Sequence, residues 1–256
     1  MALVRSGGIV KLYINGVASS ISVTSDIVNS NLSFWIGKAD NSPGGGSFIY
    51  YYNGYLSNLR IVKGVAVYTG TFTPSTTQLT STQLANVNGN PSEAITGTAT
   101  SLLTCQNSTL IDNSSYVLIL TPAGDVRPIN STTPFTQTTT TVALTTLGGT
   151  YFDGTGDYLS IPDNAALNIG TSDFEFSCWV YPTVLNSVST IIGKGTNNLI
   201  FGFNSSGTLE ISQYGVASRV SASTNLVLNQ WSYVVASRVS SISKIFLKNL
   251  LKWMLT

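Results

Sequence analysis

Short apolar runs separated by turn residues constrain the fold of this chain more than any other feature of its sequence. Val, Ile, Leu, Phe and Tyr gather in runs of about four to eight residues, and Asn-Gly, Gly-Gly, Asp-Asn or Pro stands between them. Strands have this length, whereas helices need longer segments with a period of about 3.6 residues. The pattern predicts an all-β protein, an antiparallel sandwich or barrel, without a helix before residue 240.

The clearest local signal is a hairpin over residues 10–23, VKLYINGVASSISV. Asn15 and Gly16 can supply the two positive φ angles of a type I′ turn. Several further runs are apolar on both faces, as inner strands of a two-layer sandwich are. We expect strands at 31–38, 48–64, 101–106, 116–121, 150–162, 173–183, 189–195, 198–204, 208–215 and 231–238.

Two segments, 70–100 and 121–148, have a different composition. They are rich in Thr, Ser and Pro and poor in apolar periodicity, so they are predicted to be extended connections. We therefore divide the chain into residues 1–75, a connector with short strands over 76–148, and residues 149–256.

A short internal repeat links the two ends of the chain. Residues 2–14 align with residues 235–247, and Arg5 and Lys11 then match Arg238 and Lys244 at a constant offset of 233. The repeat indicates that the chain starts and stops at equivalent points of a repeating unit.

Composition excludes several functions. Only 9% of residues are charged, the net charge is +1 and no basic run occurs, which argues against nucleic-acid binding. Histidine is absent, so Ser-His-Asp catalysis and His-ligated zinc are excluded. We expect no membrane insertion and no signal peptide, because the apolar runs are too short. Cys105 and Cys178 are too few for a disulfide framework and are expected to be buried thiols.

Residues 149–183, with the later WSYVVASR, resemble the opening of a laminin-G-like, concanavalin A-type jelly-roll domain. Residues 3–74 resemble the closing half of such a domain, through RSGGIVKLYINGV, FWIGKAD and NGYLSNLRIVKGVAVYTGTFTP. The intervening segment is similar to the connector between tandem copies in tail-fibre-like proteins of marine bacteriophages. The chain departs from the pattern at Lys248-Asn249, which replaces an Asn-Gly turn and suggests a truncated or frame-shifted gene end.

The resemblance implies a concanavalin A-like jelly roll that is circularly permuted or built from two partial copies. In a permutant the two halves pair into one sandwich, whereas two half-sandwiches would expose strand edges. The duplicated strands 2–14 and 235–247 would compete for one position, and we expect the C-terminal copy to be displaced, because Lys248-Asn249 lacks the turn glycine.

The resemblance also implies a non-catalytic module of a phage virion, located in a tail or fibre. Its partners would be host-surface carbohydrate and other fibre subunits. A purely structural fibre spacer and a glycan-degrading enzyme are the alternatives, although a shared fold does not carry a hydrolase site.

The candidate glycan-binding residues are Tyr50, Tyr52 and Asn53, because aromatic rings stack on sugars and amides bond to hydroxyls. Cross-strand packing is the more common role of such tyrosines.

Acidic residues give two further candidate groups. Asp153 and Asp157, followed by Asp163, could supply oxygen ligands to calcium, although Asp is also an ordinary turn residue. Asp173 and Glu175 are close in sequence but have no third acid nearby. We therefore expect no catalytic residue.

Two tryptophans lie within strongly apolar runs. We expect the side chains of Trp35 and Trp179 to be buried.

Overall fold

The computed structural model describes residues 2–6, 8–18, 32–41, 48–129, 133–135, 148–170, 172–195, 199–212, 220–240 and 242–246. Strands account for 47% of the structure and helices for 3%. The helical part is two short 3-10 turns, Val87–Gly89 (η1) and Ala165–Leu167 (η2). The predicted all-β antiparallel sandwich is confirmed.

The larger of the two main sheets has the strand order β1-β2-β19-β18-β13-β7-β11-β10, with β3 paired to β2 and β8 paired to β7. Its strands are β1 (Ala2–Ser6), β2 (Gly8–Ile14), β3 (Val17–Ala18), β7 (Asn53–Lys63), β8 (Thr100–Thr104), β10 (Arg127–Ile129), β11 (Gly149–Asp153), β13 (Phe174–Pro182), β18 (Ser232–Ser240) and β19 (Ile242–Phe246).

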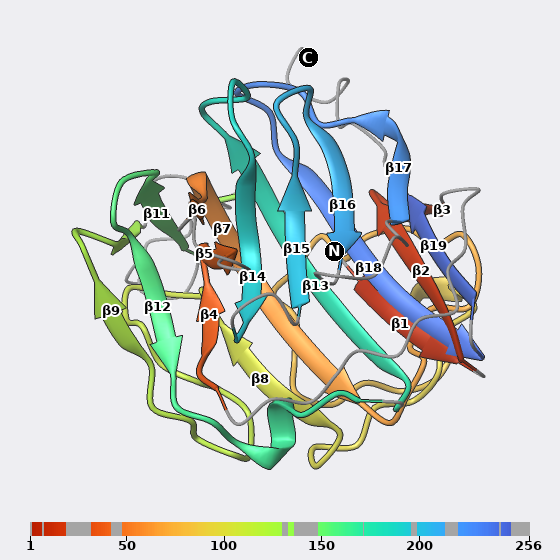
Figure 1. Ribbon diagram of the computed structural model, residues 1–256. Coiled ribbons are helices and arrows are strands. Elements are labelled where there is room, and N and C mark those ends of the chain that lie inside the picture. The colour runs from red at the N-terminus through yellow and green to blue at the C-terminus, as the bar shows by residue number, and fades with distance from the viewer. Residues whose placement is uncertain are drawn as a thin grey trace, which may run out of the picture.

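The smaller main sheet has the order β17-β16-β15-β14-β4-β12-β9. Figure 1 shows β14, β15 and β16 in front of β13 and β18, as the two layers of a sandwich. The strands are β4 (Phe34–Ile36), β9 (Thr121–Ala123), β12 (Tyr158–Ile161), β14 (Ser189–Lys194), β15 (Leu199–Phe203), β16 (Thr208–Ser212) and β17 (Val220–Asn225), and a separate hairpin joins β5 (Lys38–Asn41) to β6 (Phe48–Tyr51).

The N-terminal and C-terminal strands alternate in both sheets. In the larger sheet β7 lies between β13 and β11, and in the smaller sheet β4 lies between β14 and β12. The two layers share one core, in which Phe176 of β13 contacts Phe34 and Phe201 of the other sheet, each with ring centroids 6.4 Å apart. The two halves of the chain therefore complete one sandwich, as the permutant hypothesis requires.

The predicted turn at Asn15-Gly16 is present between β2 and β3. The φ angles are 49° and 82°, so both are positive, as a type I′ turn needs. Gly16 also lies against the backbone of Phe72, since an added Cβ would be 1.6 Å from the Phe72 carbonyl oxygen. The remainder of the predicted hairpin, from residue 19, lies outside the described residues.

One edge of β18 has two partners at the same residues. Val235 pairs with Tyr13 of β2 and also with Phe246 of β19, and β13 occupies the opposite edge of β18. The hairpins β1–β2 and β18–β19 also have the same register at the 233-residue offset, since Ala2 pairs with Tyr13 as Val235 does with Phe246. The structure also pairs β19 with β2 in parallel, with Ile242 opposite Ile9. Because a strand has only two edges, we infer that β2 and β19 are alternative occupants of one position.

Described side-chain contacts hold β2 in place. The Tyr13 hydroxyl donates to the Tyr68 carbonyl oxygen at 2.9 Å, and Asn15 makes two hydrogen bonds with the backbone of Tyr233. The expected displacement of the C-terminal copy depends on Lys248-Asn249. These residues lie outside the described residues, so that displacement stays a prediction.

The strand predicted at 116–121 is wrong. The Asp112 carboxylate accepts hydrogen bonds from the backbone N–H groups of Leu103, Ser114 and Leu118, which removes donors that a ladder would need. Val117 has a φ of 50°, which is incompatible with a strand. The segment is a loop, and only Thr121–Ala123 pairs, as β9.

Candidate functional site

The three predicted glycan-binding residues do not form a common surface. Tyr52 is fully buried, and its ring contacts Phe152 and Phe203 in the core. The Asn53 side chain donates to the Asp153 carbonyl oxygen and bonds to the Thr183 hydroxyl. Tyr50 is partly exposed on β6. Because Tyr52 is buried, it cannot contribute to a binding surface. The side-chain amide of Asn53 already makes hydrogen bonds to Asp153 and Thr183.

A different set of aromatic residues lies at neighbouring positions across the larger sheet. Cross-strand pairing places Tyr151 of β11 opposite Tyr55 of β7, and Tyr55 opposite Tyr181 of β13. Trp231 directly precedes β18 and lies beside Tyr181, because Val180 pairs with Ser232. We call Tyr151, Tyr55, Tyr181 and Trp231 the aromatic row. All four side chains are partly exposed.

The rings of the row contact each other and are tilted. Centroid distances are 5.1 Å for Tyr55–Tyr151, 5.5 Å for Tyr55–Tyr181 and 5.5 Å for Tyr181–Trp231, with interplanar angles of 46°, 76° and 61°. The Tyr55 and Trp231 centroids are 6.5 Å apart, so the rings of Tyr55, Tyr181 and Trp231 form a triangle. Such contacts hold each ring in place at the surface. Burial and the neighbouring Tyr55 raise the pKa of Tyr151, so its phenol stays neutral.

Arg127 closes one end of the row. It pairs with Tyr151 between β10 and β11, and its guanidinium carbon lies 4.5 Å from the ring centroid of Tyr151. Its partner is Asp125, with 3.2 Å between Nη1 and the carboxylate, and both side chains are exposed.

The row occupies the outer face of its sheet, and neighbouring residues explain this placement. Side chains alternate along a strand, and Leu56, Val180 and Phe152, next to the row residues in sequence, are fully buried. Farther along the same face, Trp179 is buried as predicted and packs against Tyr233 and Phe135.

Trp35 differs from its prediction. It is partly exposed on β4, and the Lys38 ammonium lies 4.9 Å from its ring and 4.7 Å from that of Tyr158. The prediction is wrong because alternation turns Trp35 away from the core that Phe34 and Ile36 enter. The lysine occupies the faces that these two rings would offer to a ligand.

Glu175 forms a buried ion pair. Its carboxylate lies 3.5 Å from Nη2 of Arg60, and the side chains are 0% and 1% exposed. Burial raises the pKa of Glu175 to about 7, which the Arg60 charge opposes. Arg60 also donates to the Thr80 carbonyl oxygen and the Gln83 side chain. The pair ties the sheet to the connector, and Glu175 has no access to a substrate.

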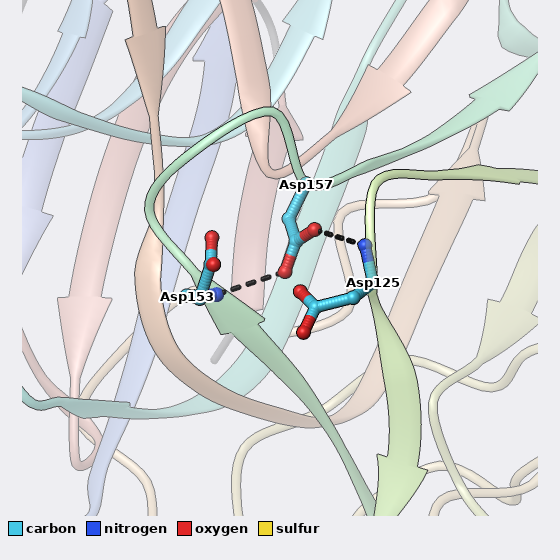
Figure 2. A group of neighbouring side chains, drawn as sticks. All are labelled: Asp125, Asp153 and Asp157. Atoms are coloured by element: carbon cyan, nitrogen blue, oxygen red, sulfur yellow. Dashed lines mark hydrogen bonds between the residues drawn. The ribbon is translucent and has the colours of Figure 1, made fainter.

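Three carboxylates meet where two turns approach each other (Figure 2). One ligand oxygen each of Asp125, Asp153 and Asp157 lies within 4.8 Å of the others. Asp157 accepts from the backbone N–H groups of Asp125 at 2.7 Å and Asp153 at 2.9 Å. Burial raises the pKa of Asp157, and these two hydrogen bonds oppose the shift.

The cluster agrees in part with the sequence analysis. The structure brings Asp153 and Asp157 together, whereas Asp163 lies elsewhere and accepts from Nζ of Lys194 at 3.3 Å. Asp125 comes from the connector and was missed, because only folding brings it to this turn. Carboxylate oxygens suit calcium, but the hydrogen bonds alone also explain the cluster. Calcium binding therefore stays a prediction.

The two thiols play no part in either group. Cys105 and Cys178 are buried and form no disulfide with each other, as predicted. Burial raises the pKa of Cys105 to about 11, so this thiol is unreactive at neutral pH.

The fold and the row define the class as a concanavalin A-like sandwich with an exposed aromatic face. Residues 153–247 match the laminin-G-type family model of the concanavalin A-like lectin/glucanases superfamily. This part of the chain is thus similar to a laminin-G-type domain, in agreement with the sandwich fold. Searches of curated proteins and of solved structures found no match. Among the described residues, no helix has the length and apolar character to cross a membrane.

Proposed function

We propose that this protein is a non-catalytic module that binds glycans through the aromatic row. The observation that carries the proposal is the group of Tyr151, Tyr55, Tyr181 and Trp231, whose rings are fixed by mutual contacts and still partly exposed. The C–H faces of sugars stack on such rings, and side chains that are already ordered lose little entropy on binding.

Two observations favour binding over hydrolysis. Glu175 is buried and paired with Arg60, and Asp157 is buried with its carboxylate held by two backbone N–H groups. A glycosidase needs two accessible carboxyl groups beside the scissile bond. Asp125 and Asp153 are accessible, but Asp125 is paired with Arg127 and Asp153 accepts from the backbone N–H of Thr155 at 2.6 Å. The superfamily also includes glucanases, so product release from polysaccharide is the direct test of the enzyme alternative.

The resemblance to tail-fibre-like proteins supplies the biological setting of the proposal. In that setting the module is part of a phage tail or fibre, its ligand is host-surface carbohydrate, and other fibre subunits are its partners. A rigid sandwich that presents a fixed surface suits this role.

A glycan array with matched tryptophan variants tests the proposal. We expect Trp231→Ala to weaken binding at least about tenfold, since aromatic hot spots contribute about 2 kcal/mol or more. Trp35→Ala is the control, because Trp35 is also partly exposed but lies on the other sheet under Lys38. Circular dichroism and Tm should show that both variants fold. Equal binding by both variants, or no bound glycan, would contradict the proposal, and the latter result would favour the spacer alternative.

A further inference from the structure

We propose that the loop between β8 and β9 is a docking surface for a second copy of this chain. The loop covers residues 105–120 and ends where β9 begins, at one edge of the smaller sheet (Figure 1). We call Ile111, Tyr116, Val117 and Ile119 the apolar patch. The inference does not depend on glycan binding, because the patch shares no residue with the aromatic row.

The exposure of these side chains is the first argument. Val117 and Ile119 are 72% and 74% exposed, and Ile111 and Tyr116 are 48% and 44% exposed. Among the other large apolar residues that the structure describes, only Leu84 is as exposed as Val117. Single exposed apolar side chains are common on soluble proteins, whereas four within nine residues mark an interaction surface.

Backbone strain at Val117 is the second argument. Its φ angle of 50° lies in the left-handed region, which a β-branched residue rarely adopts. Burial does not offset this cost, because the side chain is exposed. Strain that brings no packing within the chain is explained by a contact outside it.

Hydrogen bonds fix the loop that carries the patch. The Asp112 carboxylate accepts from the backbone N–H groups of Leu103, Ser114 and Leu118, and the N–H of Asn113 donates to the Leu103 carbonyl oxygen at 2.7 Å. The loop is therefore ordered before any contact forms, so docking costs little conformational entropy. The same bonds occupy the backbone groups of Leu103 on β8, so a partner meets side chains there and not an open strand edge.

The absence of charge identifies the partner. Asp112 is the only charged residue between Gly97 and Gly124, and it is buried. A lipid surface is usually met by basic side chains beside the apolar ones, and a charged protein would require opposite charges. Two copies of a neutral apolar patch approach each other without repulsion. A two-fold contact also has to be complementary to itself, and this patch meets that condition.

The size of the patch predicts a weak dimer. Residues of this size have on the order of 150–200 Å² of surface, so the exposed fractions amount to roughly 400 Å² on each copy. A standard stable interface buries about 800 Å² on each partner, and transient interfaces bury less. We therefore expect a reversible dimer with a dissociation constant in the micromolar range.

Analytical ultracentrifugation of the full chain tests the inference. The wild type should be a monomer at low micromolar and a dimer at high micromolar concentration. Val117→Asn and Ile119→Asn should each raise the dissociation constant at least about tenfold. Leu228→Asn is the matched control, because Leu228 is 45% exposed in the loop between β17 and β18, and it should leave the constant within about twofold of the wild type.

The strained position supplies a second measurement. Asn adopts the left-handed region more readily than a β-branched residue does. Val117→Asn should therefore keep or raise the Tm of the dilute monomer while it weakens the dimer, so that loss of the dimer cannot reflect misfolding. A lower Tm of the dilute variant would overturn the inference, because Val117 would then stabilise the isolated chain.

The remaining outcomes also decide the matter. A wild type that stays monomeric at high micromolar concentration, or a dimer that Val117→Asn and Ile119→Asn leave unchanged, would overturn the docking surface. Cosedimentation with vesicles of neutral phosphatidylcholine tests the competing partner: vesicle binding that both variants abolish, without a dimer, would assign the patch to a lipid surface and overturn the second copy. The glycan proposal is decided separately, by the array with Trp231→Ala.

Discussion

Gly16 and Gly64 have almost the same backbone conformation in different surroundings. Their φ angles are 82° and 83°. A Cβ on Gly16 would meet the Phe72 carbonyl oxygen, whereas a Cβ on Gly64 would meet no heavy atom within 4 Å. The two positions separate the cost of a left-handed backbone from the cost of a steric clash.

Replacing each glycine by alanine should therefore give unequal losses. We expect Gly64→Ala to lower the free energy of unfolding by about 1 kcal/mol through backbone strain, and Gly16→Ala by about 2 kcal/mol more, because β2 must move away from Phe72. Urea denaturation measures both. Equal losses would show that the Asn15-Gly16 turn does not pack against residue 72.

Glu175 should make stability depend on pH. Its pKa of about 7 in the folded protein exceeds the value of about 4.3 in an unfolded chain, so the folded state binds the proton more tightly. This contribution is complete below about pH 4.3 and is lost as pH rises through about 7. Between about pH 4.3 and pH 7, we expect the free energy of unfolding of the wild type to fall by up to about 3 kcal/mol relative to that of Glu175→Gln, because glutamine cannot titrate.

Urea titrations at several pH values compare the two proteins. Parallel profiles for wild type and Glu175→Gln would contradict the raised pKa.

Individual strands were predictable from their apolar pattern where no nearby polar side chain competes for their backbone hydrogen bonds. The run at 173–183 forms Phe174–Pro182, and the run at 198–204 forms Leu199–Phe203. The pattern failed at 116–121, because the Asp112 side chain takes backbone donors from that loop. A local pattern does not show which polar side chain will compete for a ladder.

The aromatic row was not predictable from local sequence. The analysis selected Tyr50 and Tyr52, which alternation along one strand would place on the same face, but β6 ends at Tyr51 and β7 begins at Asn53, and Tyr52 enters the core at this break. Tyr55 and Tyr181 meet only because β7 pairs with β13 in one register. One observation was open to sequence analysis: Tyr55, Tyr151 and Tyr181 each lie in a predicted strand.

Truncation should show which strand occupies the shared edge of β18. We expect removal of residues 241–256 to leave Tm unchanged or higher, because Tyr13 and Asn15 already anchor β2. Removal of residues 1–16 should lower Tm, because it deletes the buried Leu12, Tyr13 and Ile14, each worth about 1.5–3 kcal/mol. The opposite ranking, measured by thermal denaturation, would assign the position to β19.

At the scale of the whole molecule, neither half of the chain holds a complete layer. Both sheets alternate strands from before residue 64 with strands from after residue 148. Each half alone would leave apolar sandwich interior in water and strand edges unpaired.

Residues 1–75 and 149–256 should therefore fail to unfold cooperatively when expressed separately. Coexpression of the two pieces, with the connector attached to either one, should restore a single cooperative unfolding transition. Far-ultraviolet circular dichroism in increasing urea measures that transition. Two separately folded pieces with cooperative transitions would contradict the permutant and support two partial domains.

Because strands from the two halves alternate, neighbouring strands of the sheet are synthesised at widely separated times. The strand β7 ends at Lys63, and its neighbour β13 begins at Phe174, about 110 residues later. At about 5–20 residues per second, the ribosome needs roughly 5–20 s to deliver that partner. During this interval β8, at Thr100–Thr104, can pair with one edge of β7, but the edge that β13 will occupy stays unpaired in the nascent chain. The scarcity of charge in this sequence offers it little protection from aggregation, so folding yield should depend on translation speed and on chaperones that bind emerging chains.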